Sequence, residues 1–186
     1  MNWKYRLLVS ILFSFFLITA CSSAEETVIV VDEETGEEIE VSKELVDKQD
    51  QEKNSYSEHL TNTFDTSIGL HDSFAHALDD MFTKESSEGQ FAKILKDNVI
   101  EQSREVLDAA EKYNFPSEFF EMNQLVVQNL NNQHQLFLDA VNEATISSES
   151  ENKEIDIVKL RERLATIKQD YLTIVNTWKN GGKVEK

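Results

Sequence analysis

Four histidines and one cysteine are the side chains of this sequence best suited to chemistry. His71 lies near the middle of one apolar helical stripe, and His134 lies on the edge of another. If these two helices run parallel, a rise of about 1.5 Å per residue brings both imidazoles to a similar height. Such a pair, or one imidazole with Asn123 or Gln133, suits a transition metal or a pH-sensitive contact. The alternative is two ordinary histidines, hydrogen-bonded or exposed at the edge of a mostly apolar core.

A second polar set follows the opposite face of the first expected helix. Asp72, His76 and Asp80 are spaced i, i+4, i+8, so they either share an ion or form a solvated row. The sequence has no HExxH motif, no phosphate-binding glycine loop and no nucleophile elbow. No glutamate stands three residues before His71 or His134, as the dinuclear metal sites of helical bundles require. We therefore predict no enzymatic activity and no cofactor.

The segment QNLNNQHQ, residues 128–135, is rich in side-chain amides. An amide both donates and accepts hydrogen bonds, so a helix face made of amides is able to bind a glycan or a peptide. Outward-pointing glutamines and asparagines also serve simply to keep a protein soluble. The pattern alone favours solubility and leaves the binding surface as the second interpretation.

Cys21, the only cysteine, ends a long apolar run. Without a second cysteine it is free, intermolecular or chemically modified. Lys4 and Arg6 precede the apolar segment LLVSILFSFFLITA, which ends in the small residue Ala20. This arrangement predicts an export signal over residues 1–20. A membrane-spanning helix needs about 20 apolar residues, so a permanent transmembrane segment is the weaker alternative.

Residues 17–21, LITAC, resemble the lipobox of bacterial lipoproteins. In that class the chain is cut before the cysteine, whose thiol carries a diacylglycerol with fatty acyl chains such as palmitate. The resemblance covers residues 1–21 only, and it implies that Cys21 is the mature amino terminus and the lipid attachment site. Two acyl chains, at about 0.8 kcal/mol per buried CH₂, give a stable anchor. The expected location is the extracytoplasmic side of a cell membrane; a secreted chain with a free thiol is the alternative.

The charge of the chain limits its partners. The sequence has 18 basic and 35 acidic side chains, a net charge of −17. Cleavage before Cys21 removes Lys4 and Arg6, which leaves 16 basic against 35 acidic side chains, or −19. Such a surface repels nucleic acid, whose binding requires Lys and Arg to displace counterions, and it also repels anionic lipid headgroups. The same charge also serves simply to keep an exported protein soluble.

Residues 21–53 are expected to form an acidic tether between the anchor and the folded domain. Its many glutamates repel one another and favour extension. Within the tether, residues 27–41 carry a hairpin signature, with β-branched residues on both sides of an acidic turn that contains Gly36. An isolated two-stranded hairpin is marginal in water. Either this hairpin is transient or disordered, or it docks on the domain or on a partner.

Four amphipathic segments follow, expected at about 54–84, 88–113, 117–145 and 157–178. Ser87 and Gln90 have the spacing of a capping box that starts the second helix. A polar, serine-rich loop is expected over 145–154. The predicted stripes of the last three helices are Phe91, Leu95, Val99, Gln102, Val106, Ala110 and Tyr113; then Phe119, Asn123, Val126, Leu130, Gln133, Phe137, Val141 and Ala144; then Ile157, Leu160, Leu164, Ile167, Tyr171, Ile174 and Trp178.

Four helices that are each apolar on one stripe bury those stripes only against one another. The predicted fold is therefore all-α, an up-down four-helix bundle over 54–180 with a short tail at 181–186. A coiled-coil dimer that shares one or two helices is the architectural rival. The predicted function is that of a non-enzymatic interaction module that binds an envelope protein or a cell-wall component. The alternative is a receptor whose bundle interior, around His71 and His134, binds a ligand or a metal.

Overall fold

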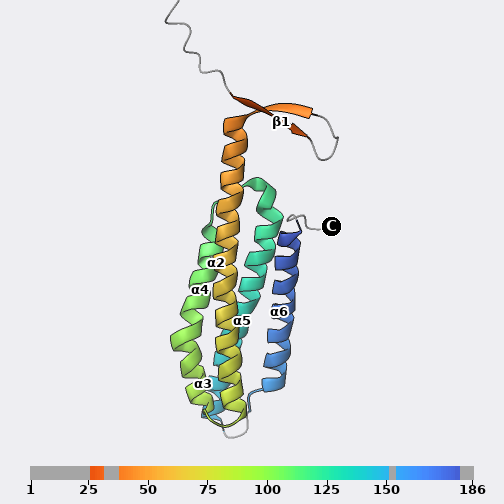
Figure 1. Ribbon diagram of the computed structural model, residues 1–186. Helices are drawn as coiled ribbons and strands as arrows, with labels where there is room; N and C mark the ends of the chain where they lie inside the picture. Colours follow the sequence, from red (N-terminus) through yellow and green to blue (C-terminus); the bar gives the residue numbers. More distant parts are fainter. Residues whose placement is uncertain (1–25, 32–37, 151–153, 181–186) are drawn as a thin grey trace, which may run out of the picture. The chain divides into compact units, whose positions relative to one another are not determined.

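The computed structural model describes residues 26–31, 38–150 and 154–180. The chain divides into two compact units, residues 1–51 and 52–186. The predicted signal, Cys21, the hairpin turn around Gly36 and the tail at 181–186 all lie outside the described residues. Figure 1 shows the course of the chain.

The first unit contains the predicted hairpin. Strand β1 (Thr27–Val31) pairs antiparallel with β2 (Glu38–Ser42), in a register that places Thr27 opposite Ser42. Lys43 closes the open end of the hairpin: its backbone N–H donates to the Glu26 carbonyl at 2.7 Å, and its ammonium lies 2.9 Å from the Glu26 carboxylate. The prediction of a hairpin before the helices is therefore confirmed.

Helix α2 (Lys43–Phe82) begins well before residue 54, where the first helix was expected. Residues 43–53 were predicted as part of an extended tether, and this prediction was wrong. The segment KELVDKQDQEK mixes charges of both signs, with Glu44 four residues before Lys48. This spacing favours a helix, and glutamate, lysine and glutamine all have good helix propensity.

The second helical segment consists of α3 (Glu88–Leu95), the π-helical turn η1 (Lys96–Ile100) and α4 (Glu101–Lys112). The predicted capping box is confirmed, because the Ser87 N–H donates to Gln90 Oε1 at 2.8 Å and the Gln90 N–H donates to Ser87 Oγ at 3.3 Å. One residue of the predicted stripe is wrong: Gln102 is exposed and Ser103 is buried in its place, whereas Ala110, later in the stripe, is buried as predicted. A π turn contains more residues than an α turn, so the buried face after η1 shifts along the sequence.

The third and fourth segments agree more closely with the predicted stripes. After the short 3₁₀ turn η2 (Ser117–Phe119), helix α5 runs over Phe120–Glu149, and all eight residues of its predicted stripe are buried. The expected loop therefore begins after Glu149 and not at 145. Helix α6 (Ile157–Lys179) is capped by Asp156, whose carboxylate accepts from the Lys159 N–H at 3.0 Å.

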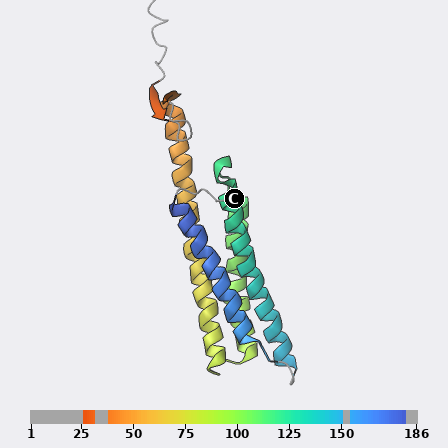
Figure 2. The same cartoon turned by 90° about the vertical axis from the view of Figure 1, so that its right-hand side faces the viewer.

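In the second unit the four helical segments form an up-down-up-down bundle, as Figures 1 and 2 show. Helix α5 packs on α3 and α4 on one side and on α6 on the other. The predicted all-α bundle with a preceding hairpin is thus confirmed. Among the helices of the described segments, none is both long and apolar enough to cross a bilayer.

The bundle core has two apolar clusters at different levels. The first cluster lies at the end of the bundle that contains α3, and it includes Phe74, Phe91 and Phe137. The second lies toward the α4–α5 connection and includes Tyr56 and Phe119. Along their helices, the buried residues Ser67, Ser103 and Gln133 lie between residues of the two clusters. Two further buried polar residues, Thr63 and Asn129, lie among those of the second cluster.

Candidate functional site: the polar layer and the His71 pocket

The buried polar residues form a layer of hydrogen bonds across three helices. Gln133 on α5 makes two of them with Ser67 on α2: its Oε1 accepts from Ser67 Oγ at 2.9 Å, and its Nε2 donates to the Ser67 carbonyl at 2.9 Å. Asn129, one turn earlier on α5, donates from Nδ2 to the Ile167 carbonyl on α6 at 3.0 Å. Each of these buried amides is paired, which offsets the cost of placing polar groups in an apolar core.

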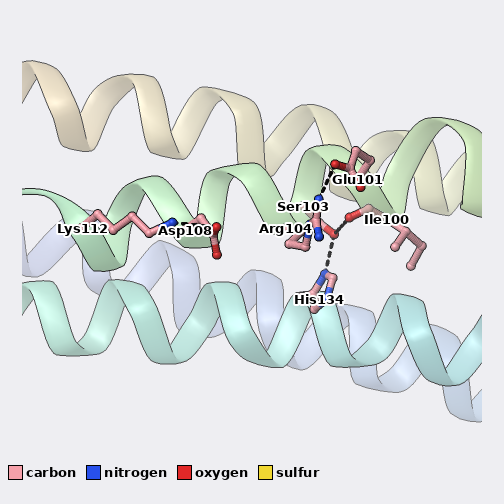
Figure 3. A network of polar contacts seen from close by, with 7 residues as sticks. All are labelled: Ile100, Glu101, Ser103, Arg104, Asp108, Lys112 and His134. Carbon is pink, nitrogen blue, oxygen red and sulfur yellow. Dashed lines mark hydrogen bonds and ion pairs between the residues drawn. The ribbon is translucent and has the colours of Figure 1, made fainter.

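On its other side, α5 contributes His134 to a second contact, with α4 (Figure 3). Ser103 Oγ donates to the Ile100 carbonyl at 2.8 Å and lies 2.7 Å from His134 Nδ1. Since the single hydroxyl proton of Ser103 points to Ile100, His134 Nδ1 carries the proton of the second hydrogen bond. Burial lowers the pKa of His134 below its ordinary value of 6.5, and the nearby Arg104 guanidinium lowers it further.

Acid is expected to destabilise the bundle through His134. In the unfolded chain this imidazole titrates near 6.5, whereas in the folded chain its pKa is lower. Below about pH 6.5 the unfolded state therefore binds a proton that the folded state binds less readily, and the free energy of unfolding decreases as the pH falls. Above about pH 7 the neutral imidazole makes its full contribution.

Urea unfolding at about pH 7.5 and pH 5.5 checks this expectation. His134→Gln keeps a side-chain N–H for Ser103 but does not titrate, so it should lose less stability between the two pH values than the native chain. His76, which is 80% exposed at its side chain, is the control position, and His76→Gln should retain the native pH dependence. An unchanged dependence in His134→Gln would contradict the assignment.

A pocket of about 210 Å³ opens between α2 and α6 at the level of the polar layer. Its walls are mainly apolar, and buried Ser67, Asn129 and Gln133 contribute polar groups to it. The full lining is Ser67, Ile68, His71, Asp72, Asn129, Gln133, Ile167, Lys168, Tyr171 and Leu172. A small apolar cavity with a few polar groups is the usual form of a site for a small molecule.

His71 is the unusual residue of this pocket. Its Nδ1 lies 3.3 Å from Asp72 Oδ1, and its side chain is 13% exposed. Its Nε2 is buried, and no group in the described part of the chain forms a hydrogen bond with it. A buried imidazole nitrogen without a partner costs free energy, so this atom is the natural position for a hydrogen-bonding or metal-binding group of a ligand.

The two histidines predicted as a pair serve different helix interfaces. His71 lines the pocket between α2 and α6, whereas His134 contacts Ser103 on α4. In the predicted acidic row, His76 Nδ1 lies 3.7 Å from Asp80 Oδ1. Over residues 26–31, 38–150 and 154–180, no three His, Cys, Asp or Glu side chains are grouped as a metal ion would require.

Three of these buried polar residues, Thr63, Ser103 and Asn129, were not among those predicted to face the core. Asn129 adjoins the stripe residue Leu130, so a wider stripe on α5 would have included it. Ser103 was missed because the π turn shifts the buried face, and the sequence gives no simple signal for such a turn.

Comparisons with models of protein families, with curated proteins and with solved structures found no match.

Proposed function

We propose that this chain is a lipoprotein anchored through Cys21 on the extracytoplasmic side of a bacterial cell membrane, where its bundle acts as a non-enzymatic interaction module. The single observation that supports the anchor is the amino-terminal sequence, in which Lys4 and Arg6 precede an apolar run that ends in LITAC. Membrane lipid, contacted through the acylated cysteine, is then the first partner.

The bundle supports a role in binding more than one in catalysis. The buried amides of Gln133 and Asn129 pair with Ser67 and with the Ile167 carbonyl. The Ser103 hydroxyl pairs with Ile100 and His134, so all of these groups serve helix packing. A lipid anchor confines the module to a thin layer, in which its effective concentration is high enough for weak contacts to matter. The chain from Cys21 has 16 basic against 35 acidic side chains, a net charge of −19, which disfavours nucleic acid and favours an envelope protein or a cell-wall component as the second partner.

Labelling with an alkyne-tagged fatty acid, followed by fractionation, tests the anchor. The native chain should incorporate the label and sediment with membranes, whereas Cys21→Ser should lose the label because serine has no thiol. Ser22→Ala is the matched control, and it should be labelled like the native chain. A native chain that stays unlabelled, or one whose mature amino terminus is Met1, would overturn the proposal.

The His71 pocket favours a second candidate function, that of a receptor for a small ligand or a metal. The observation behind it is the unpartnered Nε2 of His71. A ligand that binds only the folded state stabilises it by RT ln(1 + [L]/Kd), so the unfolding temperature rises with the ligand concentration. Zn²⁺, Cu²⁺ and Fe²⁺ are the first probes, and a shift that disappears in His71→Gln would support the receptor. If the native chain shows no shift with these metals, the metal form of this candidate fails.

A further inference from the structure

The outer face of α5 differs from the rest of the bundle surface in the types of its exposed side chains. Residues 122–137 contain no Asp, Glu, Lys or Arg, although 28% of the chain is charged. Within this stretch every exposed residue is an amide. These exposed residues are Gln124, Gln128, Asn131, Asn132 and Gln135. Elsewhere the helices rely on Glu, Asp and Lys for solubility, so solubility alone does not explain a face made only of amides.

Grooves flank this amide face on both sides. A broad groove of about 590 Å³ lies toward α4, and its lining is Glu111, Phe115, Phe120, Asn123, Gln124, Val127, Gln128 and Asn131. A smaller groove of about 220 Å³ lies toward α6, and its lining is Leu125, Gln128, Asn129, Asn132, Asp170, Thr173, Ile174 and Thr177. Gln128 lines both grooves, so it lies on the ridge between them.

The broad groove contains two phenylalanine rings. Phe120 is 52% exposed, and the ring of the half-buried Phe115 lies 6.4 Å from it, centre to centre. An exposed aromatic ring offers an apolar face with a negative quadrupole, on which the C–H groups of a sugar ring can stack. The amides beside the rings both donate and accept, as the hydroxyl groups of a sugar do.

The charges of the residues that line the two grooves limit the chemical class of the ligand further. Each groove contains one carboxylate, Glu111 or Asp170, and neither lining includes a lysine or an arginine. An anionic ligand would find no cation to pair with and would be repelled. A hydrophobic helix would require a broad apolar stripe, which this amide face does not provide.

We propose that the α5 face, from Phe120 to Asn132 with its two flanking grooves, binds an uncharged saccharide chain. This inference deepens the proposed function, because it assigns the second partner to a chemical class, the neutral glycan. Its test is made on purified protein in solution, so its outcome is independent of whether Cys21 is acylated.

The experiment is a titration of the full chain, in detergent solution, with the β-1,4-linked hexasaccharide of N-acetylglucosamine, followed by NMR of the amide groups. We expect saturable shifts that concentrate on residues 115–132. Phe120→Ala and Gln128→Glu should each weaken binding by about fivefold to tenfold, because one loses the stacking ring and the other loses the amide donor.

Two matched variants control for general effects of the substitutions. Phe82→Ala removes a phenylalanine that is 61% exposed on α2, and Gln169→Glu changes an exposed glutamine on α6. Both should bind the saccharide like the native chain. The proposal is overturned if the hexasaccharide causes no saturable shift, if the controls lose as much affinity as the test variants, or if an uncharged peptide alone produces the α5 shifts. Equal binding of polygalacturonate would also overturn it, since that polymer is anionic.

Discussion

Tyr56→Ala is expected to lower the free energy of unfolding by about 3–5 kcal/mol, the cost typical of removing a large aromatic side chain from a core. Tyr56 is fully buried and joins several segments of the second apolar cluster. Its ring stacks on Phe119 with 4.8 Å between centroids and meets the edge of Trp178 at 5.4 Å. Its loss would therefore leave a cavity and detach the end of α6 from the α4–α5 connection.

Tyr56→Phe is the matched control, because it keeps the ring and removes only the hydroxyl. That hydroxyl donates to Asn123 Oδ1 at 3.4 Å, a long hydrogen bond, so the expected loss is about 1 kcal/mol or less. Urea unfolding of the three chains measures both values. Similar losses in the two variants would mean that the hydroxyl, and not the packing of the ring, accounts for the contribution of Tyr56.

Gln133→Leu is expected to lower the free energy of unfolding by about 2–3 kcal/mol, and this loss should become smaller when Ser67→Ala is added. The single variant removes both hydrogen bonds to α2 and leaves the Ser67 hydroxyl without its partner in the core. In the double variant neither polar side chain of the pair remains, and replacing both partners of a buried hydrogen bond by apolar groups is often close to neutral.

A double-mutant cycle over Ser67 and Gln133 measures this coupling, which we expect to be about 1 kcal/mol or more. Gln169→Leu is the surface control, with an expected change within about 0.5 kcal/mol. If the effects of Ser67→Ala and Gln133→Leu simply add, the two side chains contribute independently and the polar layer does not hold α2 against α5 as a unit.

The polar layer has a consequence for the proposed binding face. Gln133 and Asn129 attach α5 to α2 and α6, and these bonds form in only one relative position of the helices. The outer side of the same helix carries Gln124, Gln128 and Asn131. A fixed α5 therefore presents these amides in a constant arrangement, which lowers the entropy cost of binding.

Much of the bundle could be predicted from local patterns. The predicted stripe is buried from Phe119, at the end of η2, to Ala144, and its positions in α5 are all buried because an uninterrupted α-helix repeats its faces with a constant period. The capping box at Ser87 and Gln90 predicted where α3 begins, since its two hydrogen bonds involve residues only three positions apart. The LITAC sequence likewise predicts the anchor at Cys21 without any tertiary information.

Other features were not predicted from these local patterns. The π turn at Lys96–Ile100 buries Ser103 in place of Gln102, and α2 begins at Lys43, within the segment that was predicted as a tether. The sequence by itself thus determined most of the helices and their apolar faces, because these depend on short-range periodicity, whereas the signal at residues 1–20 stays a prediction. Only the tertiary structure decided that Gln133 pairs with Ser67, that His71 and His134 serve different interfaces, and that grooves flank the amides of α5. Those relations depend on how four helices pack side by side, which no single helix encodes.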